Sequence, residues 1–196
     1  MGQIELNDYS DRLACAISQS VFFKKNNGEL NKSEVLDGII LALMRAKASG
    51  KKIMFIGNGG SATVAGHMAE DFSKVGGIRS MAFNDAPLLT CLGNDYSFEQ
   101  IFEKAIEIYG DPGDILFAVS SSGKSKNILN GVEAARRKSI EIVTLSGFDS
   151  ENPLSKTGDI NIHTPSRSYG IVENAHSAII HYFLDYISGK LTDAVA

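Results

Sequence analysis

The sequence predicts an α/β fold, a three-layer αβα sandwich with a five-stranded parallel sheet and a helical N-terminal extension. Two observations support this prediction. Short apolar segments that are typical of buried strands alternate with segments whose apolar residues recur every three or four positions, as on one face of a helix. This alternation of strands and helices is typical of a parallel sheet that helices cover on both faces.

The first half of the chain begins with two expected helices. The second of them ends before Gly50 and has its apolar residues on one face, namely Val35, Leu36, Ile39, Ile40 and Leu43. The apolar strand KIMFIG follows, and Ser61 opens the next helix. In order, the expected elements are helices over 7–25 and 32–49, a strand over 52–57, a helix over 61–74, a weaker strand over 80–84, and helices over 86–92 and 97–109.

The second half of the chain repeats the pattern of apolar strand, loop and helix. The segments DILFAVS, EIVTLSG and DINIHT are short, apolar and bounded by polar residues, so we expect three more strands. They occupy 114–120, 141–147 and 159–164, and the expected helices occupy 124–138 and 170–190.

Length and composition indicate one domain, 1–196, made of N-terminal helices in 1–50 and an α/β core with a C-terminal helix in 51–196. The net charge of -4 argues against nucleic acid or an anionic membrane as the main partner. The two cysteines are far apart, the N-terminus lacks the features of a signal peptide, and no apolar stretch has the length of a membrane span. These observations favour a cytoplasmic protein.

Two loops at strand ends are candidates for phosphate binding. GNGGS follows the strand over 52–57, and SSSGKS follows the strand over 114–120. Each loop leads into a helix, where free backbone N–H groups and the helix dipole favour an anion. The second loop adds the hydroxyl groups of Ser120, Ser121, Ser122 and Ser125, which suit a single phosphate monoester. Either loop alone would also fit a tight strand-to-helix turn.

Nucleotide binding is the main alternative for these loops. The segment GNGGSA matches the dinucleotide pattern G-x-G-x-x-A, and Asp85 could bind a ribose. That pattern explains neither His67 nor the serine-rich loop. The other candidate, AVSSSGKS, lacks the first glycine of a P-loop because Ala118 stands there. We therefore expect no nucleotide cofactor.

Histidines and carboxylates form a candidate metal site. His67 and Asp71 are spaced i, i+4, so they share one face of the helix after the glycine-rich loop, although such a pair alone would also fit a structural hydrogen bond. On the last helix, Glu173 and His181 lie within about 80° of one face but roughly 12 Å apart along the axis. Two imidazoles with two carboxylates would suit zinc or another divalent ion.

Four segments together resemble the sugar isomerase (SIS) domain, and most closely the phosphoheptose isomerases. The segments are GNGGSATVAGHMAED, CLGNDYSFEQIF, GDILFAVSSSGKSKNIL and IVTLSG, and the similarity runs from about residue 30 to 190. The resemblance implies conversion of sedoheptulose 7-phosphate to D-glycero-D-manno-heptose 7-phosphate, a precursor of surface carbohydrate. It also implies a flavodoxin-like five-stranded sheet and a homotetramer whose active sites lie where subunits meet.

Carried over to this chain, the resemblance assigns roles to individual residues. His67 would be a metal ligand, and His181 would be both a ligand and an acid/base residue, with Asp71 as the other catalytic group. Substrate contacts would come from Asn58, Gly59, Gly60, Ser61, Asn94, Asp95, Glu173 and the four serines of the serine-rich loop, Ser120, Ser121, Ser122 and Ser125.

This chain departs from the family pattern around the expected reacting end. Asp71 replaces the family's glutamate, and Glu173 replaces its metal-binding glutamine. Val75 and Gly170 stand where the family has an arginine and an acid. An aspartate is one methylene shorter than a glutamate, and a misplacement of about 1 Å can cost ~100-fold in rate. The departures permit a relative that acts on another phosphosugar, or one that binds without turnover.

The expected chemistry is aldose–ketose isomerisation through an enediol. This reaction needs two acid/base groups, here Asp71 and His181, and a divalent metal to polarise the substrate oxygens. The alternative is a non-catalytic SIS protein that binds a phosphosugar or serves as a replication-initiation adaptor. The expected partners are a phosphorylated sugar and further copies of the chain. The N-terminal helices, which carry Leu13, Ile17, Val21, Ile39 and Leu43, would pack against those copies.

Overall fold

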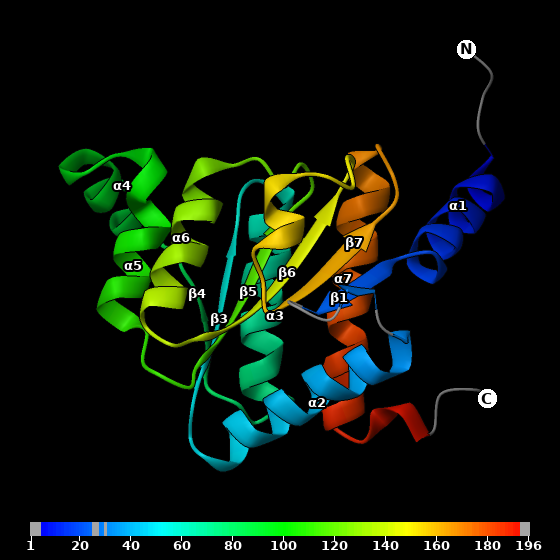
Figure 1. Cartoon of the computed structure of the whole chain (residues 1–196), viewed down its shortest axis with the longest axis horizontal. Helices are drawn as coiled ribbons and strands as arrows, with labels where there is room; N and C mark the ends of the chain where they lie inside the picture. The colour runs from blue at the N-terminus through cyan, green and yellow to red at the C-terminus, as the bar shows by residue number, and fades with distance from the viewer. Residues whose placement is uncertain (1–4, 25–27, 30, 193–196) are drawn as a thin grey trace.

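The structure is a computed structural model that describes residues 5–24, 28–29 and 31–192. Its centre is a sheet of seven strands within these residues, in the order β2-β1-β7-β6-β5-β3-β4 (Figure 1). The strands are β1 (Val21–Lys24), β2 (Gly28–Glu29), β3 (Ile53–Gly57), β4 (Ser80–Ala82), β5 (Ile115–Ser120), β6 (Glu141–Gly147) and β7 (Ile160–Thr164). The five strands from β7 to β4 are parallel, and each corresponds to a strand that the sequence predicts.

The five parallel strands were predicted, but the two antiparallel strands β1 and β2 were not, and the prediction of a helix over 7–25 was wrong beyond Ser18. The first helix, α1, ends at Ser18, and β1 adds to the edge of β7 in antiparallel orientation, with β2 beyond it. Tertiary contacts override the helical pattern here, because Phe22 is buried in the core and Ser20 Oγ lies 3.1 Å from Thr164 Oγ1 at the end of β7.

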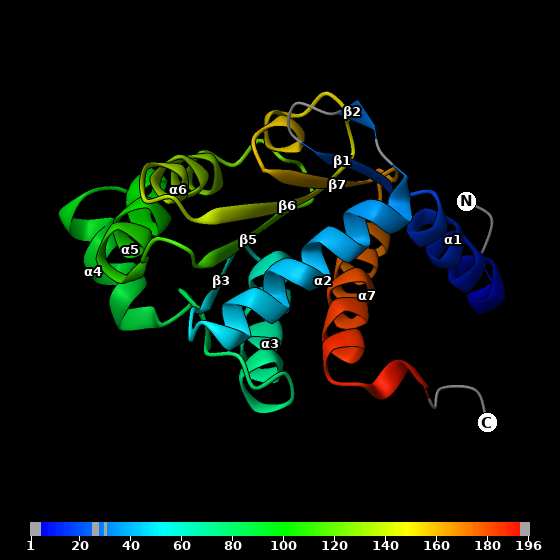
Figure 2. The ribbon, with the colours of Figure 1, turned by 60° about the horizontal axis from the view of Figure 1, so that its bottom comes forward.

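The helices cover both faces of the sheet (Figure 2). They are α1 (Leu6–Ser18), α2 (Lys32–Ala48), α3 (Gly60–Lys74), α4 (Ala86–Asp95), α5 (Ile101–Tyr109), α6 (Lys126–Arg137) and α7 (Tyr169–Ile187), with short 3₁₀ turns η1 (Phe98–Gln100), η2 (Pro153–Lys156) and η3 (Lys190–Thr192). The helix expected over 97–109 therefore starts with a 3₁₀ turn. Among the described helices, none combines the length and apolarity that crossing a bilayer requires.

Side chains of the central strands alternate between two apolar cores. Phe55 and Phe117 point to one face, where they stack at 5.2 Å and join α2, α3 and α7. Met54 and Leu116 point to the other face and pack with α4, α5 and α6. Both faces of β3 and β5 are thus dry, which explains their continuous apolar sequence.

The strand order reverses between β3 and β5: β4 lies beyond β3 on one side, and β6 and β7 lie beyond β5 on the other. Strands β3 and β5 are neighbours, yet the helix after β3 packs on one face and the helix after β5 packs on the opposite face. The loops that follow them therefore diverge at the carboxyl edge of the sheet. Such a switch point leaves a crevice where α/β proteins bind ligands.

Candidate functional site

A pocket of about 340 Å³ lies in this crevice. Two segments form most of it, and we name them the glycine loop (57–61) and the serine loop (120–125). The first turn of α7 completes it. Its lining residues are Asn58, Gly59, Gly60, Ser61, Ser120, Ser121, Ser122, Ser125, Tyr169 and Glu173. Nine of the eleven residues that the sequence predicts as substrate contacts lie in this one pocket, the exceptions being Asn94 and Asp95.

The glycine loop brings bare backbone into the pocket because two of its residues have no room for a side chain. A Cβ on Gly57 would lie 2.5 Å from the backbone oxygen of Ser61, and a Cβ on Gly60 would overlap the carboxylate of Glu173. Gly59 has φ 55°, in the left-handed region that glycine adopts at little cost. The loop thus opens α3 without a side-chain cap, and its residues 58–61 line the pocket.

The serine loop is held by its own hydrogen bonds and by the next strand. Gly123 N–H donates to Ser120 Oγ at 3.2 Å, and Gly147 N–H at the end of β6 donates to the Ser121 carbonyl at 3.0 Å. Gly123 has φ 63°, and a Cβ there would overlap the side chain of Asn152. The loop is therefore a fixed turn rather than a free connection.

Ser121 provides the clearest sign of a ligand. Its side chain is 5% exposed and lines the pocket, but its Oγ has no hydrogen-bond partner within the described part of the chain. A buried hydroxyl without a partner costs free energy, so such groups usually have a role or an external partner. A phosphate oxygen in the pocket would supply that partner.

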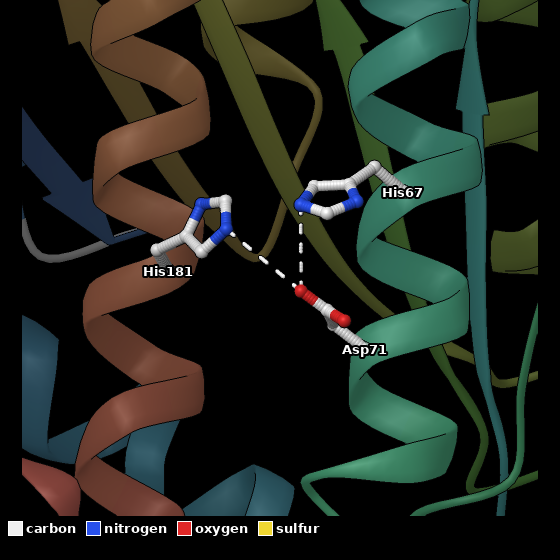
Figure 3. Close-up of side chains that lie close together, drawn as sticks. All are labelled: His67, Asp71 and His181. Carbon is white, nitrogen blue, oxygen red and sulfur yellow. Dashed lines mark ion pairs between the residues drawn. The ribbon is translucent and has the colours of Figure 1, made fainter.

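Beyond the pocket, His67, Asp71 and His181 form a compact group (Figure 3). Asp71 Oδ2 lies 3.4 Å from His67 Nε2 and 3.9 Å from His181 Nε2. One ligand atom from each residue lies within 4.8 Å of the others, so a single cation could contact all three. His67 and Asp71 come from α3 and His181 comes from α7, which runs beside it.

The hydrogen bond of His181 suits metal binding. Its Nδ1 lies 2.8 Å from the carbonyl oxygen of Ser177, which can only accept a hydrogen bond. Nδ1 must therefore carry the proton, and in the neutral ring the lone pair is on Nε2, the atom that faces Asp71. Histidine ligands of metals are commonly oriented by a second hydrogen bond of this kind. The residues present fit a divalent cation.

Glu173 does not belong to this group. Among the described residues, the only metal-binding combination is His67, Asp71 and His181, whereas Glu173 faces the start of α3 at Gly60. The reason is its position on α7, two turns before His181, or about 12 Å along the axis. The sequence predicts Glu173 both as a metal ligand and as a substrate contact, and the structure places it in the pocket.

Asn94 and Asp95 lie outside the pocket. They are at the end of α4, they are exposed, and Asn94 Nδ2 donates to Asp95 Oδ1 at 3.0 Å. Two residues of this region were not predicted from the sequence: Tyr169 lines the pocket, and Asn127 is hydrogen-bonded to Asn58. An aromatic residue at the start of the last helix and a polar residue on the otherwise apolar face of α6 were the available signals.

Two further histidines lie behind the serine loop rather than in the site. His163 Nδ1 lies 3.3 Å from Ser146 Oγ, and His176 Nε2 lies 3.1 Å from the Ser146 carbonyl oxygen. Burial lowers the pKa of His176 to about 4, although the hydrogen bond to Ser146 acts to raise it. Burial also lowers the pKa of His163. Both rings therefore remain neutral near pH 7.

The architecture and sequence are similar to those of known proteins. The SIS domain family model matches residues 25–147. A phosphoheptose isomerase from Photorhabdus laumondii is 33% identical over 196 residues, covering 97% of this chain and 96% of that protein. The structure of a phosphoheptose isomerase from Neisseria gonorrhoeae superimposes with a TM-score of 0.78 at 26% identity, covering 92% of this chain and 94% of that chain. The structure of a phosphoheptose isomerase from Francisella tularensis superimposes with a TM-score of 0.76 at 26% identity, covering 94% of this chain and 97% of that chain.

Proposed function

This chain belongs to the phosphoheptose isomerases of the SIS domain family, and from that premise we propose that it interconverts sedoheptulose 7-phosphate and D-glycero-D-manno-heptose 7-phosphate. One observation carries the proposal. The pocket at Gly60 and Glu173 and the group at His67 and His181 are separated by two turns on both α3 and α7, or about 10 to 12 Å. An extended heptose phosphate is long enough to have its phosphate in one and its reacting carbons at the other.

In this proposal the serine loop binds the phosphate. Ser120, Ser121, Ser122 and Ser125 contribute hydroxyl groups, and the start of α6 contributes the favourable end of its dipole. The Oγ of Ser121 gains the partner that it lacks among the described residues. The fixed shape of the loop means that little ordering is needed on binding, which favours affinity.

At the other end, Asp71 and His181 exchange protons with the substrate. Isomerisation removes a proton from one carbon and returns one to its neighbour, so two acid/base groups must face adjacent carbons. Asp71 Oδ2 and His181 Nε2 are 3.9 Å apart and converge from α3 and α7. The Ser177 carbonyl keeps the Nδ1 proton of His181 in place, so Nε2 has the only lone pair of the ring, and it exchanges a proton with the substrate only while it is not bound to a cation.

We further propose that His67, Asp71 and His181 hold a divalent cation, with zinc as the best match to two imidazoles and a carboxylate. When bound, such an ion would polarise the carbonyl group of the substrate and so favour loss of the proton from the neighbouring carbon, which bears the hydroxyl. His67 is half-exposed and Asp71 is partly exposed, so the group is open to both ion and substrate.

The same proposal includes assembly of several copies through the N-terminal helices and α7. The prediction that Ile39 and Leu43 contact other copies was wrong, because both are buried in the core of the chain itself. The large apolar side chains that are exposed include Leu41 and Met44 on α2 and Tyr182 and Tyr186 on α7. Exposed apolar patches mark contact sites. We propose a homotetramer in the cytoplasm, where the exposed free thiols of Cys15 and Cys91 would stay reduced. A monomer by light scattering at micromolar concentration would contradict the assembly.

The decisive experiment is turnover. The purified protein, supplied with zinc, is incubated with sedoheptulose 7-phosphate, and a new aldose phosphate is sought by NMR and mass spectrometry. We expect product with the unaltered chain and none with His181→Ala. Binding of the substrate without product would instead favour the alternative, a phosphosugar-binding SIS protein without catalysis.

A further inference from the structure

Asn58 and Asn127 form a reciprocal pair of amide hydrogen bonds across the switch point. Asn58 Nδ2 donates to Asn127 Oδ1, and Asn127 Nδ2 donates to Asn58 Oδ1, both at 2.9 Å. Asn58 belongs to the glycine loop after β3, and Asn127 lies in the first turn of α6, just after the serine loop. The pair therefore joins the two loops at the point where the chain leaves the sheet toward opposite faces.

The two partners have different surroundings. Asn127 is 3% exposed, and its Oδ1 also accepts a hydrogen bond from Ile128 N–H at 3.0 Å. This second bond defines which end of the Asn127 amide is the oxygen. Asn58 lines the pocket, and the pair uses one N–H and one lone pair of its amide. One N–H and one lone pair of Asn58 remain for a ligand.

We propose that Asn127 is a positioning residue for substrate binding, which acts by fixing the amide of Asn58 in one of its two orientations. The terminal torsion of an asparagine is broad and roughly twofold, so an unpaired amide would present either its N–H or its oxygen at the same place. The pair selects one arrangement before the sugar arrives, and it also fixes the separation of the glycine and serine loops. Pre-organisation of this kind strengthens binding. The identity of the sugar rests on the proposed function, but the hydrogen-bond pair does not.

The first test needs no ligand. The rate of backbone amide hydrogen exchange at the start of α3, where N–H groups donate to carbonyls of the glycine loop, is compared in three proteins. They are the unaltered protein, Asn127→Ala and the control Asn130→Ala. Asn130 lies one turn later on the same helix and donates to the Glu99 carbonyl at 2.9 Å, away from the pocket. Loss of the pair should speed exchange of the Ala62 and Thr63 amides, which donate to the carbonyls of Asn58 and Gly59, about fivefold or more, whereas the control should not. Unchanged exchange in Asn127→Ala would overturn the proposal, whatever the substrate.

A second variant covers the case in which Asn127→Ala does not fold. Asn127→Asp has nearly the same shape and keeps the acceptor for Ile128 N–H, but it cannot donate to Asn58 Oδ1. The negative charge is acceptable at the start of α6. Asn127→Asp should also speed exchange of the Ala62 and Thr63 amides, by less than Asn127→Ala does. Unchanged exchange in Asn127→Asp would likewise contradict the proposal.

The functional test is a double-mutant cycle on sedoheptulose 7-phosphate. Asn127→Ala should raise KM about tenfold with little change in kcat, as should Asn58→Ala, because the contact between Asn58 and the bound substrate is weakened in the first variant and lost in the second. If Asn127 acts through Asn58, the double variant should be no worse than Asn58→Ala alone. Additive effects, or an equal effect of Asn130→Ala, would contradict a positioning role. If the unaltered protein shows no turnover, the proposed function is contradicted. The role of Asn127 in holding Asn58 is then tested by the hydrogen-exchange experiment alone.

Discussion

The carboxylate of Glu173 on α7 occupies the space in which a side chain at Gly60 would lie. Gly60 is the first residue of α3, so this carboxylate sits at the positive end of that helix, inside the pocket where we propose that a phosphate binds. A side chain at residue 60 would therefore require the Glu173 carboxylate to move. A phosphate bound as we propose would share the pocket with this carboxylate.

Replacing Glu173 by glutamine should therefore strengthen anion binding. The change keeps the shape and removes the charge, and a nearby charge in a partly solvated site contributes ~1 kcal/mol, or about fivefold in affinity for inorganic phosphate. Isothermal titration at low and high salt measures this, and the gain should shrink with salt. Glu133→Gln, an exposed glutamate on α6, is the control. Equal or weaker phosphate binding by Glu173→Gln would show that the carboxylate does not face the anion.

Ser121→Ala should weaken phosphosugar binding without lowering the free energy of unfolding. The Oγ of Ser121 is buried and has no partner within the described residues, so removing it should leave the free energy of unfolding unchanged or slightly raised. Binding of a phosphosugar should weaken by about fivefold to tenfold, since a hydrogen bond to a charged group is lost. Denaturant unfolding and titration on the same samples provide both numbers.

Ser155→Ala is the matched control with the opposite expectation. Ser155 is equally buried, but its Oγ donates within the protein, lying 2.7 Å from the Asn152 carbonyl oxygen. Its loss should cost ~1 kcal/mol of stability and leave phosphosugar binding unchanged. If Ser121→Ala behaves like Ser155→Ala, then the Ser121 hydroxyl has a structural role and the phosphate lies elsewhere.

Much of the site could be predicted because it depends on local sequence. A glycine loop and a serine loop, each between an apolar strand and a helix, must lie at the carboxyl edge of a parallel sheet, and the i, i+4 spacing of His67 and Asp71 fixes their common face. His181 came from resemblance, because nothing local to α7 says that it faces α3. The pairing of Asn58 with Asn127 could not be predicted, since it depends on which strands are neighbours.

The errors have equally physical causes. The segment at Val21 and Phe22 follows a helix without a strong stop signal, and only the exposed edge of β7 makes it a strand. Glu173 was assigned to the metal group although two helical turns separate it from His181, a distance that one helix cannot close. Glu173 lies in the pocket because α3 and α7 run side by side, with Glu173 next to Gly60 and, two turns later, His181 next to His67.

Asp71→Asn should weaken zinc binding about tenfold or more. The asparagine keeps the size of the side chain but removes the only carboxylate in the group, leaving two imidazoles as effective ligands. Competition with a chromophoric chelator measures the affinity. The control is Glu70→Gln, which removes one negative charge from the adjacent, exposed position on α3. If both variants lose the same affinity, the effect is general electrostatics and Asp71 is not a ligand.

Acid should destabilise the fold through His176. Its pKa is lowered to about 4 by burial in the folded chain and returns to the ordinary value of 6.5 in the unfolded chain. Between these values the unfolded state binds a proton that the folded state does not, so stability is full above pH 6.5 and falls with pH toward 4. For this one group the loss amounts to roughly 3 kcal/mol. Neighbouring His163, also buried and with a lowered pKa, should add in the same direction.

The measurement is the free energy of unfolding by urea between pH 7.5 and 4.5, for the unaltered chain and for His176→Gln. The glutamine can still donate to the Ser146 carbonyl but does not titrate, so the slope of stability against pH should be shallower in this window. Asn130→Ala, which alters a side chain that does not titrate, should keep the original slope. NMR of the ring resonances tests the same point without substitution, because His176 should stay neutral down to about pH 5. A slope that is the same in both variants, or a His176 ring that titrates near pH 6.5, would contradict the buried neutral state.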